Sequence, residues 1–235
     1  MTAEQPTPKT PTPDVHLYLL LDRSGSMASM ADDVIGGFNR LLADQQADGA
    51  DARMTLVQFD GQDAQEVLAD AVPIAEMVEL DHQTFVPRAS TPLLDATGML
   101  LGRASSRAAQ RATDGQAPEE IVIVSITDGH ENASSEYTLA AVKQLIAAHT
   151  LGGWTFVFLG AALDVYGEAG GLGYDRRSVQ SFYADGAGAD VAFESLSRST
   201  SSLRQKVRHL ESFDKGDFFE DDKPAEDDRK ERGGS

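Results

Sequence analysis

The 235-residue sequence contains no cysteine, which excludes a disulfide scaffold, a thiolate zinc site and a cysteine nucleophile. Basic residues are also scarce. Lysine and arginine number 20 against 38 aspartates and glutamates, so the formal net charge is −18 and the chain repels phosphate backbones and anionic lipid heads. No apolar run approaches the ~18 residues that a membrane-spanning helix needs. We therefore expect neither nucleic acid nor a membrane as a partner.

The two ends of the chain differ in composition from the rest. The first fourteen residues are rich in threonine and proline, and they lack the basic start and the apolar stretch of a secretion signal. We predict a disordered leader over residues 1–14 and, because no export signal is present, a cytoplasmic protein of bacterial type. Residues 211–235 are rich in acid, with Phe213, Phe218 and Phe219 as their only large apolar side chains. We predict a disordered acidic tail there.

Residues 15–210 are predicted to form one domain, in which β-branched and aromatic runs alternate with helical patterns. This alternation is typical of βα units around a parallel sheet. The predicted strands cover residues 15–21, 53–59, 65–72, 121–126, 154–159 and 179–183, and the predicted helices cover about 28–46, 93–110, 136–148, 161–169 and 190–209. The link from the second strand to the third is too short for a parallel crossover, which predicts an antiparallel hairpin at the sheet edge. The expected fold is α/β, doubly wound and Rossmann-like, with six mostly parallel strands, one antiparallel edge strand and helices on both faces.

Three short motifs place oxygen side chains where predicted strands and helices meet. Asp22, Ser24 and Ser26 follow the first strand, Thr91 precedes the second helix within Ser-Thr-Pro, and Asp128 follows the fourth strand in an Asp-Gly pair. Each motif has an ordinary structural alternative, since the serines and Thr91 are typical helix caps and Asp-Gly is a common turn.

The predicted topology makes the positions of these motifs depend on one another. If the edge strand pairs with the second strand and the second with the first, the chain must cross to the other side of the first strand. Asp22 and Asp128 then leave neighbouring strands at the switch point where open α/β sheets bind ligands, and Thr91 opens the crossing helix. We therefore expect five oxygen side chains around one point.

All five side chains are hard oxygen donors, which favours Mg²⁺, Mn²⁺ or Ca²⁺ over zinc or copper. The hydroxyls carry no charge and the two carboxylates neutralise a dication only formally, so the ion would stay electrophilic. A carboxylate from another molecule is the natural further ligand, because it adds a strong charge-assisted bond. The sequence thus predicts a metal site with a position open to a partner.

In order and spacing, Asp22-x-Ser24-x-Ser26, Thr91 and Asp128 resemble the metal-ion-dependent adhesion site (MIDAS) of von Willebrand factor type A (vWA) domains. The resemblance covers about residues 15–209 and implies the vWA form of the Rossmann-like fold. It implies a divalent cation bound directly by Ser24 and Ser26, with Thr91 and the aspartates binding directly or through water. The implied function is to bind the Asp or Glu of a partner protein through the metal. Family members with short cytoplasmic chains often resemble companions of AAA-type ATPases or parts of stress-response systems, so such a partner is an expectation here.

Two further hypotheses concern neighbouring residues. His130 follows Asp128 and could be the general base of a metal-dependent hydrolase using the same site. No other cluster in the sequence supplies the second metal or the oxyanion donor that such an enzyme usually needs, so we expect a binding module and not an enzyme. The aromatic and acidic residues 213–222 could occupy the open metal position or form a docking motif for a partner.

Overall fold

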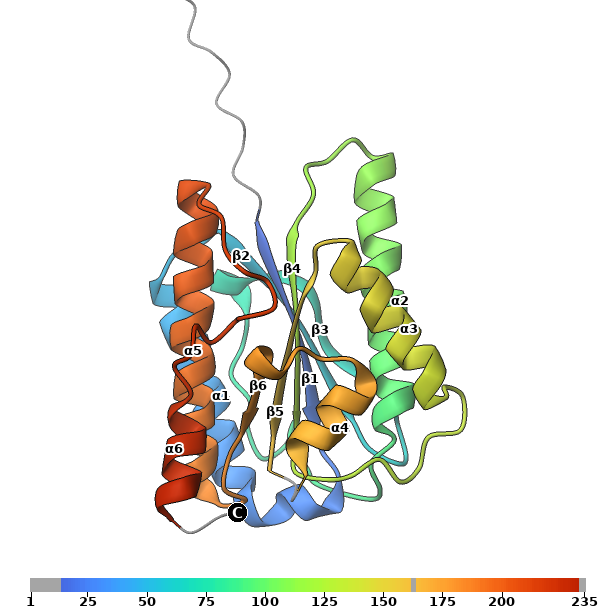
Figure 1. Ribbon diagram of the computed structural model, residues 1–235, viewed down its shortest axis with the longest axis vertical. Coiled ribbons are helices and arrows are strands. Elements are labelled where there is room, and N and C mark those ends of the chain that lie inside the picture. The colour runs from blue at the N-terminus through green and yellow to red at the C-terminus, as the bar shows by residue number, and fades with distance from the viewer. Residues whose placement is uncertain (1–13, 162–163, 233–235) are drawn as a thin grey trace, which may run out of the picture.

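The computed structural model describes residues 14–161 and 164–232, which form a six-stranded sheet between two layers of helices (Figure 1). The predicted leader, apart from residue 14, lies outside the described residues. The strands are β1 (Val15–Asp22), β2 (Ala52–Phe59), β3 (Glu66–Pro73), β4 (Glu120–Thr127), β5 (Thr155–Gly160) and β6 (Val179–Ser181). They are ordered β3-β2-β1-β4-β5-β6, and all neighbours are parallel except β2 and β3. The predicted fold class is confirmed, including the antiparallel edge strand.

The helices cover both faces of the sheet. The α-helices are α1 (Ala31–Ala47), α2 (Leu93–Thr113), α3 (Leu139–Leu151), α4 (Val165–Leu172), α5 (Gly186–His209) and α6 (Pro224–Glu231), and the short 3₁₀ helices are η1 (Gly25–Met30), η2 (Ile74–Glu76) and η3 (Arg176–Ser178). One apolar core lies between the sheet and the layer of α1 and α5, and a second lies between the sheet and α2, α3 and α4. Every residue of β1 is buried, because this central strand is covered on both faces, which explains its nearly continuous run of apolar residues.

Three helices begin at residues other than those predicted, and side-chain caps account for the difference. Thr138, Asp164 and Asp185 each accept a hydrogen bond from a backbone N–H in the first turn of α3, α4 and α5. Such a cap satisfies one of the unpaired N–H groups at a helix start, and it therefore fixes the first turn independently of the apolar periodicity used for the prediction. The helix predicted from residue 28 also differs, because its first turns are the 3₁₀ helix η1.

Residues 211–232, here called the C-terminal strap, are ordered against the domain, so the prediction of a disordered tail is wrong for them. Phe219 and Ala225 are buried in the core beside α5, and α6 packs on α5 and β6. The backbone N–H of Phe218 donates to Ser178 Oγ at 3.1 Å, and that of Ala225 donates to Gln180 Oε1 at 3.1 Å. The aromatic side chains thus cover apolar surface that α5 and the three-residue strand β6 leave open. Residues 233–235 lie outside the described chain.

The described chain starts and finishes at opposite ends of the sheet. The carbonyl of Asp14 accepts a hydrogen bond from the N–H of Glu120, at the amino ends of β1 and β4. Arg232 forms an ion pair with Asp185, which caps α5 just beyond the carboxyl end of β6. Across the described residues, no helix combines the length and the apolar character needed to cross a bilayer.

Candidate metal centre

The adjacent carboxyl ends of β1 and β4 bring two aspartates together. The strands are parallel neighbours with Leu21 opposite Ile126, so Asp22 ends β1 beside the point where Asp128 follows β4. After β2 and β3 the chain crosses through α2 to the other side of β1, which makes this edge the switch point of the sheet. The two aspartates thus follow neighbouring strands, as the sequence predicted.

The loop after β1 turns two serine hydroxyls toward the same place. The backbone N–H of Ser24 donates to Asp22 Oδ1 at 2.7 Å, which curls the loop around the carboxylate. The hydroxyl oxygens of Ser24 and Ser26 are 3.1 Å apart. Ser24 occupies the cap position of η1, yet its hydroxyl makes no capping hydrogen bond. The capping alternative therefore does not account for Ser24.

Hydrogen bonds connect the loop after β1 to the end of β4. Ser26 Oγ donates to Asp128 Oδ1 at 2.6 Å, and Thr127 Oγ1 donates to Asp22 Oδ2 at 2.5 Å. Thr127 also accepts from the N–H of Gly129 at 3.1 Å and so holds the turn that carries Asp128. The two loops thus form one connected cluster of five oxygen side chains, those of Asp22, Ser24, Ser26, Thr127 and Asp128.

Thr91 reaches this cluster across Gly129. A methyl group added at Gly129 would lie 3.0 Å from Thr91 Oγ1, 3.6 Å from Ser26 Oγ and 3.7 Å from Asp22 Oδ2. Side-chain oxygens from two separate loops, the one after β1 and the one before α2, thus lie around the space that this glycine leaves in a third loop. Helix α2 has Pro92 in the cap position, and no side chain makes a capping hydrogen bond at its start. The helix-cap alternative therefore does not account for Thr91.

Asn132, a residue that no sequence motif singles out, fixes Thr91 in place. The N–H of Thr91 donates to Asn132 Oδ1 at 2.9 Å, and the N–H of Asn132 donates back to the Thr91 carbonyl at 3.1 Å. This two-way link joins the loop before α2 to the loop after β4. A lone asparagine four residues after an aspartate carries no spacing signal, so only the contact reveals its role.

Burial gives the two carboxylates unusual electrostatics. The side chain of Asp22 is fully buried, and desolvation raises its pKa to about 6 against the opposing hydrogen bonds from Thr127 and Ser24. Burial likewise raises the pKa of Asp128. Neither carboxylate forms an ion pair with another described residue, because the neighbouring guanidinium of Arg23 turns away to Asp60 and Glu66. A buried anion beside a half-buried one, with no counter-charge for either, is costly to the folded state, and a bound cation would remove that cost.

The donor set fits a hard divalent cation. Among residues 14–161 and 164–232, no group of three or more histidines, cysteines, aspartates or glutamates could hold a metal ion. The cluster described above has only two carboxylates, and its remaining donors are the hydroxyl oxygens of Ser24, Ser26 and Thr91. Oxygen donors of this kind, together with water, suit Mg²⁺, Mn²⁺ or Ca²⁺ and not zinc or copper.

His130 is not directed into this cluster. Its Nδ1 atom lies 3.5 Å from Glu168 Oε2 on α4, and its side chain is 59% exposed. Glu131 accepts hydrogen bonds from the backbone N–H groups of Leu94 and Ser134, so it ties its loop to the start of α2. These contacts place His130 at the solvent-exposed rim of the oxygen cluster and give Glu131 a structural role.

Comparison with known proteins shows the fold. No protein-family model and no curated protein matches the sequence. Among solved structures, the chain is similar to a von Willebrand factor type A protein from Catenulispora acidiphila, with a TM-score of 0.53 and 14% identity over 80% of this chain and 43% of that chain. It is similar to the open conformation of the pilus adhesin SpaC from Lactobacillus rhamnosus GG, with a TM-score of 0.62 and 13% identity over 83% and 31% of the two chains. It is also similar to the vWA domain of SpRpn10, with a TM-score of 0.51 and 11% identity over 77% and 94%.

The chain spans less than half the length of the Catenulispora and Lactobacillus chains. Identities this low show the fold alone. The protein therefore has the fold of vWA domains, built around a cluster of oxygen side chains at the carboxyl edge of the sheet.

Proposed function

We propose that this protein is a divalent-metal-dependent protein–protein interaction module. A cation, Mg²⁺ in the first instance or Mn²⁺ or Ca²⁺, is held by Asp22, Ser24, Ser26, Thr91 and Asp128. The observation that supports this best is a buried carboxylate, Asp22, next to a half-buried one, Asp128, neither with a cationic partner, beside hydroxyls that cap no helix. When bound, the cation supplies a coordination position for the Asp or Glu side chain of a partner.

The residues of the cluster differ in how deeply they are buried, and this difference sets their roles. Asp22 and Ser24 are buried and form the floor, where the Thr127 hydroxyl and the Ser24 N–H fix the Asp22 carboxylate. Ser26 is exposed and Asp128 half-exposed, so the cluster opens to solvent on their side. A partner carboxylate would approach from there, and the ordered floor would lower the entropy cost of forming the site.

The partner is proposed to be a protein of the same compartment, for which we propose the cytoplasm of a bacterial cell. We propose an AAA-type ATPase or a component of a stress-response system as the class of partner, as the motif resemblance implied. No covalent step is part of the proposal.

The first experiment measures metal and partner binding together. Isothermal titration with Mg²⁺ should detect a site in the wild type and none in Asp22→Asn. The variant Glu79→Gln, which removes an exposed carboxylate outside the cluster, should bind like the wild type. Pull-downs from native lysate with Mg²⁺ and with EDTA should then recover partners that depend on both the metal and Asp22. Equal Mg²⁺ binding by the wild type and Asp22→Asn would contradict the proposal.

A further inference from the structure

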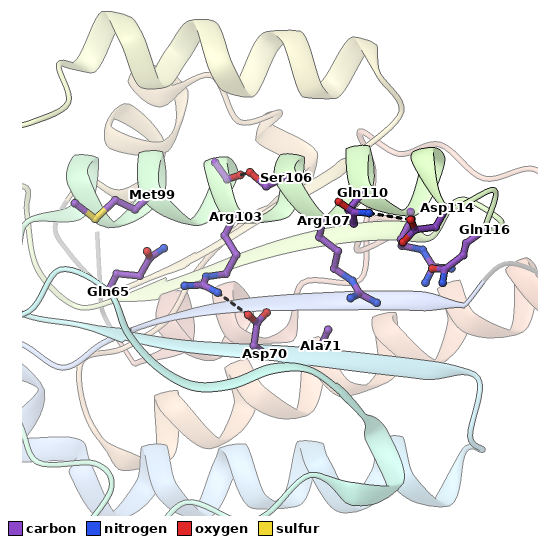
Figure 2. Close-up of a pocket in the computed structure, with 12 residues that line it drawn as sticks. Gln65, Asp70, Ala71, Met99, Arg103, Ser106, Arg107, Gln110, Asp114 and Gln116 are labelled. Carbon is purple, nitrogen blue, oxygen red and sulfur yellow. Dashed lines mark hydrogen bonds and ion pairs between the residues drawn. The ribbon is translucent and has the colours of Figure 1, made fainter.

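A polar groove runs between α2 and the edge strand β3, separate from the metal centre. Its volume is about 640 Å³. Arg103, Arg107 and Arg111 of α2 line one wall, and Asp70 and Ala71 of β3 lie across from them. Figure 2 shows Arg103 and Arg107 extending from the helix toward the sheet, with Arg103 bonded to Asp70. Three arginines in one groove are unusual in a chain whose net charge is −18.

The arginines are spaced by one helical turn. A rise of ~1.5 Å per residue puts residues four apart at about 6 Å along the helix axis. In an extended peptide, side chains on the same face are two residues apart, which is ~6.6 to 6.8 Å. The spacing of the arginines along α2 therefore matches alternate side chains of an extended segment.

Several donors on the groove wall lack acceptors. The Nε atoms of Arg103 and Arg111 and the Nε2 atom of Gln65 are buried and make no hydrogen bond within the described residues. Arg107 is different, because it binds Glu119 with two hydrogen bonds of 2.8 and 3.1 Å. Arg103 and Arg111 are thus the two arginines of the groove that keep a donor without an acceptor. Arg103 pairs with Asp70, whereas Arg111 pairs with Glu119 and also donates to the Ala117 carbonyl at 2.8 Å.

The shape of the groove favours a long ligand over a compact one. From Met99 to Arg111 the lining residues of α2 cover about 18 Å along the helix axis, whereas a phosphate ion would reach only one or two guanidinium groups. The groove also runs beside β3, an edge strand that pairs only with β2. An extended chain is the ligand that can use both the row of arginines and the neighbouring strand.

We propose that this groove binds an extended segment of a partner protein that carries aspartate or glutamate at alternate positions. Charge complementarity selects the ligand, because the groove lining has three arginines against two aspartates, Asp70 and Asp114, whereas the chain as a whole has a net charge of −18. A guanidinium group has five N–H donors, so Arg103 can keep Asp70 and still bind an incoming carboxylate. Binding here is independent of the metal centre.

The test uses a labelled nine-residue peptide of alternating glutamate and serine, followed by fluorescence anisotropy. The double variant Arg103→Gln/Arg111→Gln removes the two arginines with spare donors and leaves Arg107 to neutralise Glu119. The matched control is Arg40→Gln/Arg198→Gln, which removes the same charge from two exposed arginines outside the groove. A second peptide of the same composition, with its glutamates in one run, controls for the spacing.

We expect the double variant to bind the alternating peptide at least about tenfold more weakly than the wild type, and the control variant to bind within about twofold. EDTA should leave this binding unchanged, which separates it from the proposed metal function. Absence of binding to the wild type would overturn the proposal. So would equal affinity for the two peptides, an equal loss in both double variants, or displacement of the peptide by inorganic phosphate at a concentration below the peptide's own dissociation constant.

Discussion

The substitution Asp22→Asn should stabilise the protein in chelator and destabilise it, relative to the wild type, in Mg²⁺. The amide has nearly the shape of the carboxylate, and its oxygen can still accept from the Ser24 N–H. Thr127 loses its acceptor at Asp22 but already lies 3.1 Å from the Gly129 carbonyl, to which it can donate instead. The substitution therefore removes a buried charge with little change in packing.

The size of the effect follows from the raised pKa. Burial moves the pKa of Asp22 from 3.8 to about 6. At ~1.4 kcal/mol per pKa unit, the ionised carboxylate costs the folded state about 3 kcal/mol. The folded pKa lies above the unfolded one, so the wild type avoids this cost below pH 3.8, where Asp22 is protonated in both states. The wild type loses that stability as the pH rises through 6 and Asp22 ionises in the folded state. In EDTA at pH 8, Asp22→Asn should thus unfold with a free energy up to about 3 kcal/mol larger than that of the wild type.

Mg²⁺ should reverse the order of the two proteins. At 1,000 times its dissociation constant, a ligand that binds only the folded state adds ~4.1 kcal/mol, and only the wild type should gain it. This gain exceeds the deficit of about 3 kcal/mol that the wild type has in chelator at pH 8. Urea unfolding at pH 5 and pH 8, each with Mg²⁺ and with EDTA, measures the free energy of unfolding of each protein in these four conditions. Glu79→Gln serves as the control. A variant that is less stable than the wild type in EDTA at pH 8 would refute the electrostatic reasoning, and an equal gain from Mg²⁺ would refute the site.

Three further predictions address the site, the strap and the opposite end of the sheet. Gly129→Ala should weaken Mg²⁺ binding about tenfold or more in a titration, because the added methyl meets Thr91 Oγ1 at 3.0 Å, whereas Gly170→Ala, which meets nothing within 4 Å, should leave it unchanged. Phe219→Ala should lower the free energy of unfolding by about 3 kcal/mol in urea, since this side chain is 1% exposed, and a change below about 1 kcal/mol would contradict the packing of the strap. Hydrogen bonds and charge from His16 and Arg107 lower the pKa of Glu119 to about 2 despite its burial, so the stability it contributes should be lost as the pH falls from 4.5 to 2. Glu119→Gln should flatten the measured pH dependence in that range.

The parts of the fold that the sequence predicted are those that depend on local patterns and short links. The apolar run of β1 marked a central strand, and the predicted link of residues 60–64 was short enough to require the antiparallel hairpin that the structure has. From these two facts the strand order follows, and so does the meeting of Asp22 with Asp128. The cap residues could not be ranked in advance, because Thr138 and Asp164 differ from many other threonines and aspartates only in their contacts.

The strap could not be predicted, because its packing depends on residues distant in the sequence. Its acidic composition is typical of disorder, but Asp222 lies 3.4 Å from Arg198 and Glu220 forms an ion pair with Lys206, both on α5. These partners reduce the charge repulsion that would otherwise keep the segment extended. The apolar surface that receives Phe219 exists only after β6 and α5 have come together.

The ends of the described chain have a practical consequence for any binding assay. Arg232 is anchored at Asp185, on the same edge of the sheet as the oxygen cluster, whereas Asp14 lies at the far edge beside Glu120. A protein immobilised through its last residues would present the cluster toward the support and shield it from large molecules in solution. Attachment through the first residues would instead leave that edge facing outward.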